Sequence, residues 1–392
     1  MSTIASPSPK LPIQPLSLPG KGGYSVPTPP VVPTPGVGRG REGLLAGLNT
    51  GRPNAGGADF GVVHKGRASQ TMSHKAGDDS ASIEPWMKAF GPHAAAAAKA
   101  VARMDEGFDA KDRPKRGVMT PITVNGIPRG LLCGHPETRE QAFAELIGTA
   151  KNGSGVINLA GHEAEKYGFP LVPSRFPAGK PQCSANGAFE ITRLNSAPRR
   201  VENLGPNASG KTMDAEIFTY RVRHMASGKS RDVPVADVMN YEDTSTPPGD
   251  SLRKIHEMGE SLGVQHPERM THRCGAGIGR SATQKEVAIA SQESDRRKAT
   301  NEEMSVPDMM TFTADVTRQI RQQRGHAVMP DPYQQMAVLL FGMDEVEKRA
   351  KEAQEAKHKE KPQALPPRAA PVIPHNPAAL VHPALRALAV RG

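Results

Sequence analysis

The segment His272–Ser281 (HRCGAGIGRS) places a cysteine, an arginine and three glycines within ten residues. Five residues separate Cys274 from Arg280. A tight loop that closes from a cysteine to an arginine can point successive backbone amides inward and bind an anion. Glycine permits the backbone angles and the close approach that such a loop needs. The predicted phosphate-binding residues are Gly275, Ala276, Gly277, Ile278, Gly279 and Arg280.

The same segment predicts nucleophilic chemistry at sulfur. Loop amides, the Arg280 guanidinium and the N-terminus of a following helix all favour the thiolate form of Cys274. A thiolate placed there can attack phosphorus and form a phosphocysteine. Arg280 offers a planar pair of donors for phosphate oxygens, and Ser281 can donate a hydrogen bond to the sulfur and ease its later departure. The loop and the arginine neutralise the phosphate, so we expect neither a metal ion nor a cofactor.

A proton donor for the leaving group is expected upstream of this loop. The run Asn240–Asp243 (NYED) follows a predicted strand and precedes a loop rich in Thr, Pro and Gly. Asp243 on a mobile loop could protonate the leaving oxygen and then activate water. Taken alone, an aspartate in this position is also typical of a turn or a helix cap.

Hydrophobic periodicity predicts the elements that position these residues. Helices and strands mix over the central part of the chain, which favours an α/β or α+β domain. The predicted strands are 122–124, 156–160, 189–192, 216–223 and 233–239. The predicted helices are 93–104, 138–150, 251–262, 284–291, one that begins at Ser305 with a capping box to Asp308, and one that runs from Gln334 through Phe341 and can extend into the charged residues 345–357.

Composition indicates that only part of the chain folds. Aromatic residues are 4% of the sequence, against 37 Pro and 39 Gly, so large apolar groups are too few to offset the ordering entropy of all 392 residues. We expect a disordered leader, a linker, one catalytic domain and a tail. Their bounds are 1–85 for the leader, 86–114 for a helical linker, 115–345 for the domain, and 346–392 for a charged helix followed by a Pro-rich disordered tail.

Charge and cysteine content limit the class of protein. The net charge of +10 suggests an anionic partner, which could be nucleic acid, anionic lipid, an acidic protein or a phosphorylated substrate. No stretch approaches the ~20 apolar residues of a membrane span. The widely spaced Cys133, Cys183 and Cys274 fit neither a disulfide framework nor a zinc cluster. We therefore expect a reducing environment, no membrane span and, given the phosphate motif, no nucleic acid partner.

A second motif indicates a different function. Residues Gly205–Thr212 (GPNASGKT) match the nucleotide-binding pattern GxxxxGK[ST]. That motif requires a buried strand before it and a helix after it. Residues 196–203 are polar, and residues 216–223 alternate like a strand. The sequence therefore predicts a hairpin loop here and argues against nucleotide binding.

Residues 120–345 resemble the catalytic domain of bacterial type III-secreted protein tyrosine phosphatases of the YopH type, and the matching segments occur in the same order along the chain. The resemblance implies the phosphatase fold, a central mixed sheet flanked by helices. It also implies Cys274 as nucleophile, Arg280 as phosphate ligand and Asp243 as general acid. The matching segments are Cys274–Ser281, Asn240–Asp243, Cys133–Glu145 and Ser305–Arg324.

The resemblance implies two supporting residues and shows several departures. Glu163 lies where a glutamate orients the phosphate-loop arginine, and Gln335 matches a late glutamine that positions water and substrate. The departures are Arg273 in place of histidine, Tyr241 and Glu242 in place of Trp-Pro, and Pro330 or Asp331 in place of a first late glutamine.

The resemblance thus implies a secreted effector that hydrolyses phosphate monoesters, with phosphotyrosine in a host protein as the first expected substrate. Secretion by a type III system into the host cytosol is implied, and the N-terminal segment is a candidate site for a secretion chaperone. Two alternatives remain open. One is the same chemistry on an inositol polyphosphate, as in phytases of this superfamily, and the other is a phosphate-binding module that does not turn over substrate.

Overall fold

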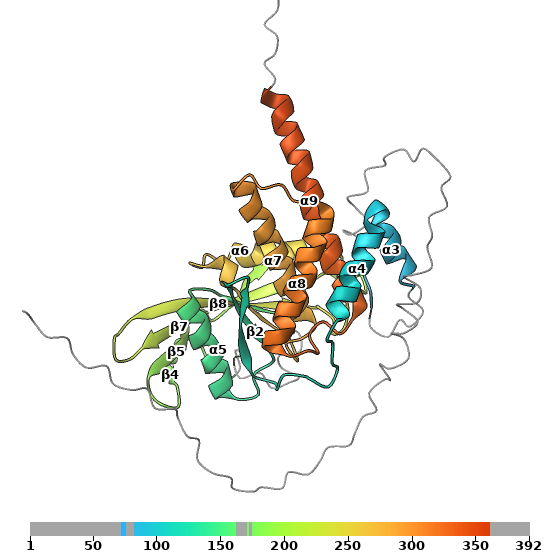
Figure 1. The fold of residues 1–392 in the computed structure, drawn as a ribbon. Helices are drawn as coiled ribbons and strands as arrows, with labels where there is room; N and C mark the ends of the chain where they lie inside the picture. Colours follow the sequence, from blue (N-terminus) through green and yellow to red (C-terminus); the bar gives the residue numbers. More distant parts are fainter. Residues whose placement is uncertain (1–71, 76–81, 162–170, 172–174, 361–392) are drawn as a thin grey trace, which may run out of the picture. The chain divides into compact units, whose positions relative to one another are not determined.

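A mixed sheet forms the centre of the computed structural model (Figure 1), which describes residues 72–75, 82–161, 171 and 175–360. The sheet order is β1-β2-β9-β3-β8-β7-β5-β4, and β6 pairs with β7. The strands β2, β9, β3 and β8 are parallel to one another, and the remaining pairings are antiparallel. Its nine strands are β1 (Met119–Val124), β2 (Ile127–Cys133), β3 (Val156–Asn158), β4 (Gln182–Cys183), β5 (Phe189–Arg193), β6 (Arg199–Val201), β7 (Asp214–His224), β8 (Ser230–Met239) and β9 (Thr271–Arg273).

Seven α-helices accompany the sheet within the described ranges, so the predicted mixed α/β class is confirmed at this level. Two short 3₁₀ turns, η1 (Gly91–His93) and η3 (Pro267–Arg269), precede α4 and β9. None of the helices in these ranges is long and apolar enough to cross a membrane. The helices are α3 (Glu84–Ala89), α4 (Ala94–Asp105), α5 (Arg139–Asn152), α6 (Gly249–Glu260), α7 (Arg280–Ala299), α8 (Val306–Arg324) and α9 (Pro332–Glu360).

Each face of the sheet packs against its own helical layer. Alternation along β8 shows this, because Val233 and Val235 lie in a core with α5, whereas Ala236 and Val238 lie in a core with α4 and α6–α9. Figure 1 shows α5 set apart from the group α7, α8 and α9. Because both faces are covered, the parallel strands at the centre of the sheet are buried.

Capping residues fix where α5 begins and ends. Thr138 and Gln141 form a reciprocal capping box at its start, and Gly153 ends it in the left-handed region at φ 67°. These bounds agree closely with the helix predicted from the sequence. A second capping box, between Ser305 and Asp308, begins α8 as predicted.

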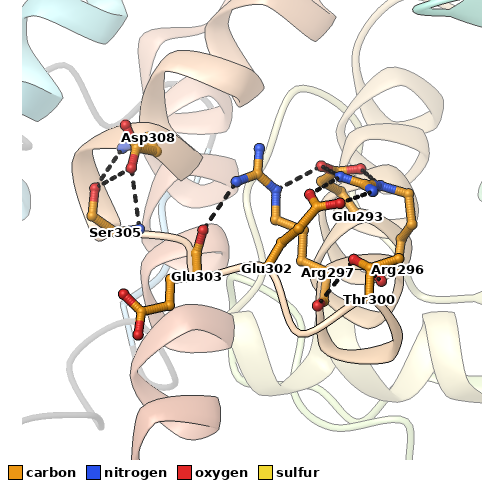
Figure 2. A network of polar contacts seen from close by, with 8 residues as sticks. All are labelled: Glu293, Arg296, Arg297, Thr300, Glu302, Glu303, Ser305 and Asp308. Atoms are coloured by element: carbon orange, nitrogen blue, oxygen red, sulfur yellow. Dashed lines mark hydrogen bonds and ion pairs between the residues drawn. The ribbon is translucent and has the colours of Figure 1, made fainter.

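The connection from α7 to α8 is fixed by charged side chains (Figure 2). Glu293 accepts hydrogen bonds from Arg296 at 2.9 Å and from Arg297 at 2.8 Å. Arg296 also donates to Glu302 at 2.9 Å, beyond the helix end. This network connects the end of α7 to the segment that leads into the capping box of α8.

Helices and contacts appear before the predicted start of the domain. His74 pairs with Thr246, although residues 72–75 lie within the predicted leader. Trp86 of α3 and Met104 of α4 are buried in the main core, although both lie within the predicted linker. The folded part of the chain thus includes residues that the sequence assigned to flanking segments. Residues 1–71 and 76–81 of the leader and the tail beyond residue 360 lie outside the described residues.

Each strand and helix predicted from the sequence overlaps an observed one. Two strands next to the candidate site were not predicted. The strand β2 (IPRGLLC) contains a proline and a glycine, and β9 (THR) has only three residues, so neither carries a sustained apolar pattern. Both are strands because the sheet pairs them on each side.

A buried carboxyl between α7 and α8 predicts how stability changes with pH. Glu286 is buried and accepts a hydrogen bond from Thr317 at 2.8 Å, and burial raises its pKa to about 8 from an ordinary value of 4.5. The folded chain therefore keeps this proton at pH values where the unfolded chain has lost it. Stability from this group is greatest below pH 4.5 and falls as the pH rises toward 8.

We expect the free energy of unfolding of the native chain, relative to the Glu286→Gln variant, to fall by up to about 1.4 kcal/mol per pH unit between pH 5 and 8. Urea denaturation of both proteins across that range measures the difference between their free energies of unfolding. The contributions of the other titrating groups cancel in that difference. Glu303→Gln, at an exposed position, is the control and should show a flat difference. A flat difference for Glu286→Gln would contradict the prediction.

Candidate active site

The loop from Cys274 to Gly279 connects β9 to α7 at the centre of the sheet. It leaves the carboxyl end of β9 between the parallel neighbours β2 and β3, which pair with it through Cys133 and Asn158 opposite Arg273. Ligand sites in open α/β sheets form at such carboxyl ends. The sequence-predicted phosphate loop therefore occupies a position suited to a ligand.

All five carbonyl groups of residues 275–279 accept hydrogen bonds from outside the loop. The donors come from the segment before α5, from α7, from α8 and from the segment before α9. The pairs are His135 N to Gly275 O at 2.9 Å, Arg324 Nη2 to Ala276 O at 3.3 Å, Arg324 Nε to Gly277 O at 3.3 Å, Met329 N to Ile278 O at 2.8 Å, and Thr283 N to Gly279 O at 2.9 Å.

Outward carbonyls determine the direction of the amides. In a planar trans peptide the N–H of one residue points opposite to the C=O of the residue before it. The amides of residues 276–280 therefore point to the inner side of the loop. Within the described part of the chain, the inward amides of Ala276, Ile278 and Gly279 donate to no protein acceptor. They form a concavity of donors suited to an anion.

The sulfur of Cys274 lies on the inner side of this loop. Its Sγ is 3.3 Å from the amide nitrogen of Gly277, which donates to it, and 3.2 Å from Ser281 Oγ. The residue is 3% exposed. A sulfur turned away from the loop amides would have been incompatible with attack on a bound phosphoryl group, and that arrangement is not observed.

Gly277 shows why the loop needs glycine at this point. Its φ is +73°, in the left-handed region, and a Cβ there would lie 2.5 Å from the backbone carbonyl of Cys133 and from the guanidinium of Arg324. A larger residue would therefore displace either the neighbouring strand β2 or the side chain that braces the loop.

Arg280 connects the phosphate loop to two other segments. Its Nη1 donates to Leu159 O, just after β3, and to Tyr241 O, just after β8, both at 3.0 Å. Its Nη2 lies 3.0 Å from Asp243 Oδ1, and this aspartate is 62% exposed at its side chain. The structure thus brings the predicted general acid next to the predicted phosphate ligand, although they are 37 positions apart in the sequence.

The loop that carries Asp243, which we call the acid loop (residues 240–248), is held at its start. Asn207 Nδ2 donates to Asn240 O at 2.8 Å, and Asn240 Nδ2 donates to Thr212 O at 3.0 Å. Asn207 belongs to the segment that matches the nucleotide-binding pattern. Pro206 and Thr212 pair across that segment and no helix follows it, so the predicted hairpin loop is confirmed. Its contacts place it as a support for the acid loop.

Tyr241 anchors the acid loop in the core. Its side chain is fully buried, and burial raises the pKa of its hydroxyl. The departure from tryptophan therefore keeps a large buried aromatic group at this position. Glu242 follows it, and its carbonyl accepts a hydrogen bond from Ser245 Oγ at 2.7 Å, which closes the turn around Asp243.

Arg273, the departure that precedes the cysteine, points away from the sulfur toward α5. Its Nη1 donates to Glu145 Oε2 at 2.9 Å, and its Nη2 lies 3.9 Å from Asp237 Oδ1. Burial raises the pKa values of Glu145 and Asp237, and the Arg273 charge opposes the rise in both. Arg273 therefore supports β9 from the opposite face of the sheet rather than lining the phosphate site.

Arg324 is a site residue that the sequence analysis did not identify. Besides the two loop carbonyls, its Nη1 donates to Val118 O at 2.6 Å and to Thr120 Oγ1 at 3.0 Å. These described acceptors are all neutral, so the guanidinium charge adds to the positive potential behind the loop. Its position, four residues after Ile320 on the buried face of α8, was the available signal, since a charged residue there requires buried partners.

The late glutamine at the loop is Gln334 and not Gln335. Gln334 lies against Gly279, where an added Cβ would be 3.3 Å from its Nε2, and this amide is 3.5 Å from Ser245 O. Gln335 Nε2 instead donates to Asp105 Oδ1 at 3.2 Å and to Met329 O at 3.1 Å. The assignment of Gln335 is therefore corrected, because one position along a helix turns the side chain by about 100°.

Glu163, the predicted partner of Arg280, lies outside the described residues, which stop at Gly161 and resume at Leu171. Within the residues that the structure describes, no group of three or more His, Cys, Asp or Glu side chains is arranged to hold a metal ion.

Comparison with protein-family models found no match, and comparison with curated proteins found no similar sequence.

The bracing role of Arg324 predicts a specific loss. We expect Arg324→Ala to lower the free energy of unfolding by about 2–3 kcal/mol, because it leaves buried carbonyl oxygens without donors. It should also weaken inorganic phosphate binding, since the carbonyls of residues 276 and 277 are then free to turn inward. Thermal denaturation with and without phosphate measures both effects.

Arg318→Ala is the matched control on the same helix. Arg318 is 38% exposed and its ion pairs at 3.8 and 3.9 Å lie at the surface, so its loss should change stability by less than about 1 kcal/mol. Equal effects of the two substitutions would overturn the bracing role.

Proposed function

We propose that this chain is a phosphoric monoester hydrolase that acts through a phosphocysteine on Cys274. The observation that carries the proposal is the position of the Cys274 sulfur beneath a ring of inward amides, with Gly277 N at 3.3 Å and Ser281 Oγ at 3.2 Å. Arg280 beside this ring supplies the planar cation that a phosphate dianion requires. We also propose that the chain has the fold of the secreted tyrosine phosphatases of the YopH type, which its sequence resembles.

In the first step the Cys274 thiolate attacks phosphorus while the bond from phosphorus to the ester oxygen breaks. The loop amides and Arg280 hold the three non-bridging oxygens, whose charge is greatest in the transition state. The phosphate takes the place of the Asp243 carboxylate on Arg280. Asp243, released from that pair as a carboxylate, takes up a proton from solvent as the substrate binds and then donates it to the departing oxygen.

In the second step Asp243, now ionised, accepts a proton from a water molecule that attacks the phosphocysteine. The bond from sulfur to phosphorus breaks, inorganic phosphate leaves, and the thiolate is restored. Ser281 Oγ, 3.2 Å from the sulfur, donates a hydrogen bond to the departing thiolate. On this proposal the Gln334 amide, which lies next to Gly279, orients the water.

Burial of the sulfur favours an aryl phosphate. Cys274 is 3% exposed, so phosphorus must reach the bottom of the loop. A phosphate carried on a long, rigid phenol reaches it more readily than one on the short side chain of serine. We therefore propose phosphotyrosine in a host protein as the substrate, reached after secretion by a type III system.

An inositol polyphosphate is the second candidate, and one observation favours it. The exposed turn at residues 111–116 carries four basic side chains. It lies near the phosphate loop, because Val118 O accepts from Arg324, which also donates to Ala276 O. A ligand with several phosphates that extends from the inner side of the loop past its edge could bind both elements at once. The basic residues are Lys111, Arg113, Lys115 and Arg116.

We expect Cys274→Ser to lower turnover of an aryl phosphate by at least about 10⁴-fold, since the serine hydroxyl is not ionised at neutral pH. Binding of inorganic phosphate should persist, because the amides and Arg280 remain. Cys183→Ser, which changes an exposed cysteine, is the control and should match the native rate. Undiminished turnover in Cys274→Ser would refute the proposal, and phosphate binding without turnover in the native chain would identify a binding module.

Substitutions in the turn at residues 111–116 distinguish the two proposed substrate classes. On the phosphotyrosine proposal, exchanging Lys115 and Arg116 for glutamines changes kcat/KM for a phosphotyrosine peptide by less than about threefold. On the inositol phosphate proposal, native turnover is faster with phytate and the same exchange lowers kcat/KM for phytate by about tenfold or more. Parallel steady-state assays of phosphate release from the two substrates measure this.

A further inference from the structure

The far end of the acid loop is paired with a segment from near the start of the chain. His74 N donates to Thr246 O at 2.9 Å, and Thr246 N donates to His74 O at 2.8 Å. This reciprocal antiparallel pair ties the loop three residues after Asp243 to residues 72–75, which we call the clamp segment. Thr246 is fully buried at this contact.

The His74 side chain fixes the clamp segment to the start of α9. Its ring stacks on Tyr333 with centroids 3.6 Å apart and planes 10° from parallel. Its Nδ1 lies 3.8 Å from Asp331 Oδ2. Trp86 of α3 meets the edge region of the same Tyr333 at 5.7 Å. His74 thus joins the acid loop to a packed aromatic group that belongs to the domain body.

The first turn of α9 also contacts the acid loop directly. Gln334 Nε2 is 3.5 Å from Ser245 O and lies against Gly279 of the phosphate loop. The residues Ser245 and Thr246 are therefore held between the clamp segment and α9. The side chain of Asp243 is 62% exposed and contacts Arg280. The position of Asp243 therefore depends on how Ser245 and Thr246 are held.

We propose that the clamp segment, residues 72–75, holds the acid loop closed over the phosphate loop, and that His74 is the positioning residue for Asp243. This inference rests on the proposed function. The pair of backbone hydrogen bonds restrains the loop, and the histidine ring anchors that restraint to Tyr333 and Asp331.

Loss of a positioning role for His74 has a different effect on the proposed reaction from loss of a packing contact. Protonation of the departing oxygen matters for a basic leaving group and matters little for an acidic one. A displaced Asp243 therefore slows hydrolysis of phosphotyrosine and leaves hydrolysis of 2,4-dinitrophenyl phosphate nearly unchanged. General disorder of the domain would slow both substrates alike.

The experiment measures kcat for both substrates in the full-length native chain, His74→Ala, His74→Phe and Lys75→Ala. We expect His74→Ala to lower kcat on phosphotyrosine roughly 10- to 100-fold and to change kcat on dinitrophenyl phosphate by less than about twofold. His74→Phe keeps the stacked ring and should recover part of the loss. Lys75→Ala, at an exposed position beside it, should behave as the native chain.

A second measurement does not require activity. Hydrogen exchange at the amides of residues 241–246 should quicken in His74→Pro, which removes the N–H that donates to Thr246 O, and stay unchanged in Lys75→Ala. Unchanged exchange together with equal rate losses on both substrates, or with no loss, overturns the clamp and leaves the proposed function standing. Native turnover that survives Cys274→Ser overturns the proposed function, and the positioning role of His74 with it.

Discussion

The candidate site depends on one constraint, which is that the carbonyl oxygens of residues 275–279 are held on the outside of their loop. Peptide planarity then turns the following amides inward, and no separate device is needed to aim them. The donors that impose this constraint are His135, Thr283, Arg324 and Met329, which come from four different segments. The anion site is therefore a property of the assembled domain, and the cysteine motif supplies only its inner surface.

Three buried arginines surround this loop, and their partners separate their roles. Arg273 is paired with the carboxylate of Glu145, so its charge is compensated on the far face of the sheet. Arg324 has only neutral acceptors within the described part of the chain, and burial lowers its pKa while the nearby thiols raise it. Arg280 faces Asp243, a partner that a phosphate can replace. The charge of Arg324 thus lies behind the loop, and that of Arg280 faces a partner that an anion can displace.

Sequence reasoning succeeded where a local pattern carries the structure. The glycine-rich loop before α7 and the capping box at Ser305 each depend on residues close together in the sequence. Both are observed in the predicted places. It failed where the position of a side chain depends on other elements. Gln334 and Gln335 differ by one helical step, which only the packing of α9 decides, and Arg324 acquires its role because α8 ends beside the loop. The short strand β9 likewise exists through its neighbours.

The acid loop shows why the geometry of the candidate site cannot be predicted from the sequence alone. Asn240 and Thr244 both have positive φ values, 65° and 51°, which non-glycine residues adopt only when surrounding contacts hold them there. Those contacts come from Asn207 on one side and from His74 and Gln334 on the other, segments separated by 133 and 127 positions (207 − 74 and 334 − 207). On the proposed function the loop closes for proton transfer and opens for product release, so its far end has to be held by contacts that are few and reversible. Two backbone hydrogen bonds and a stacked ring meet that requirement at the His74 end, whereas the fully buried Tyr241 fixes the start of the loop in the core.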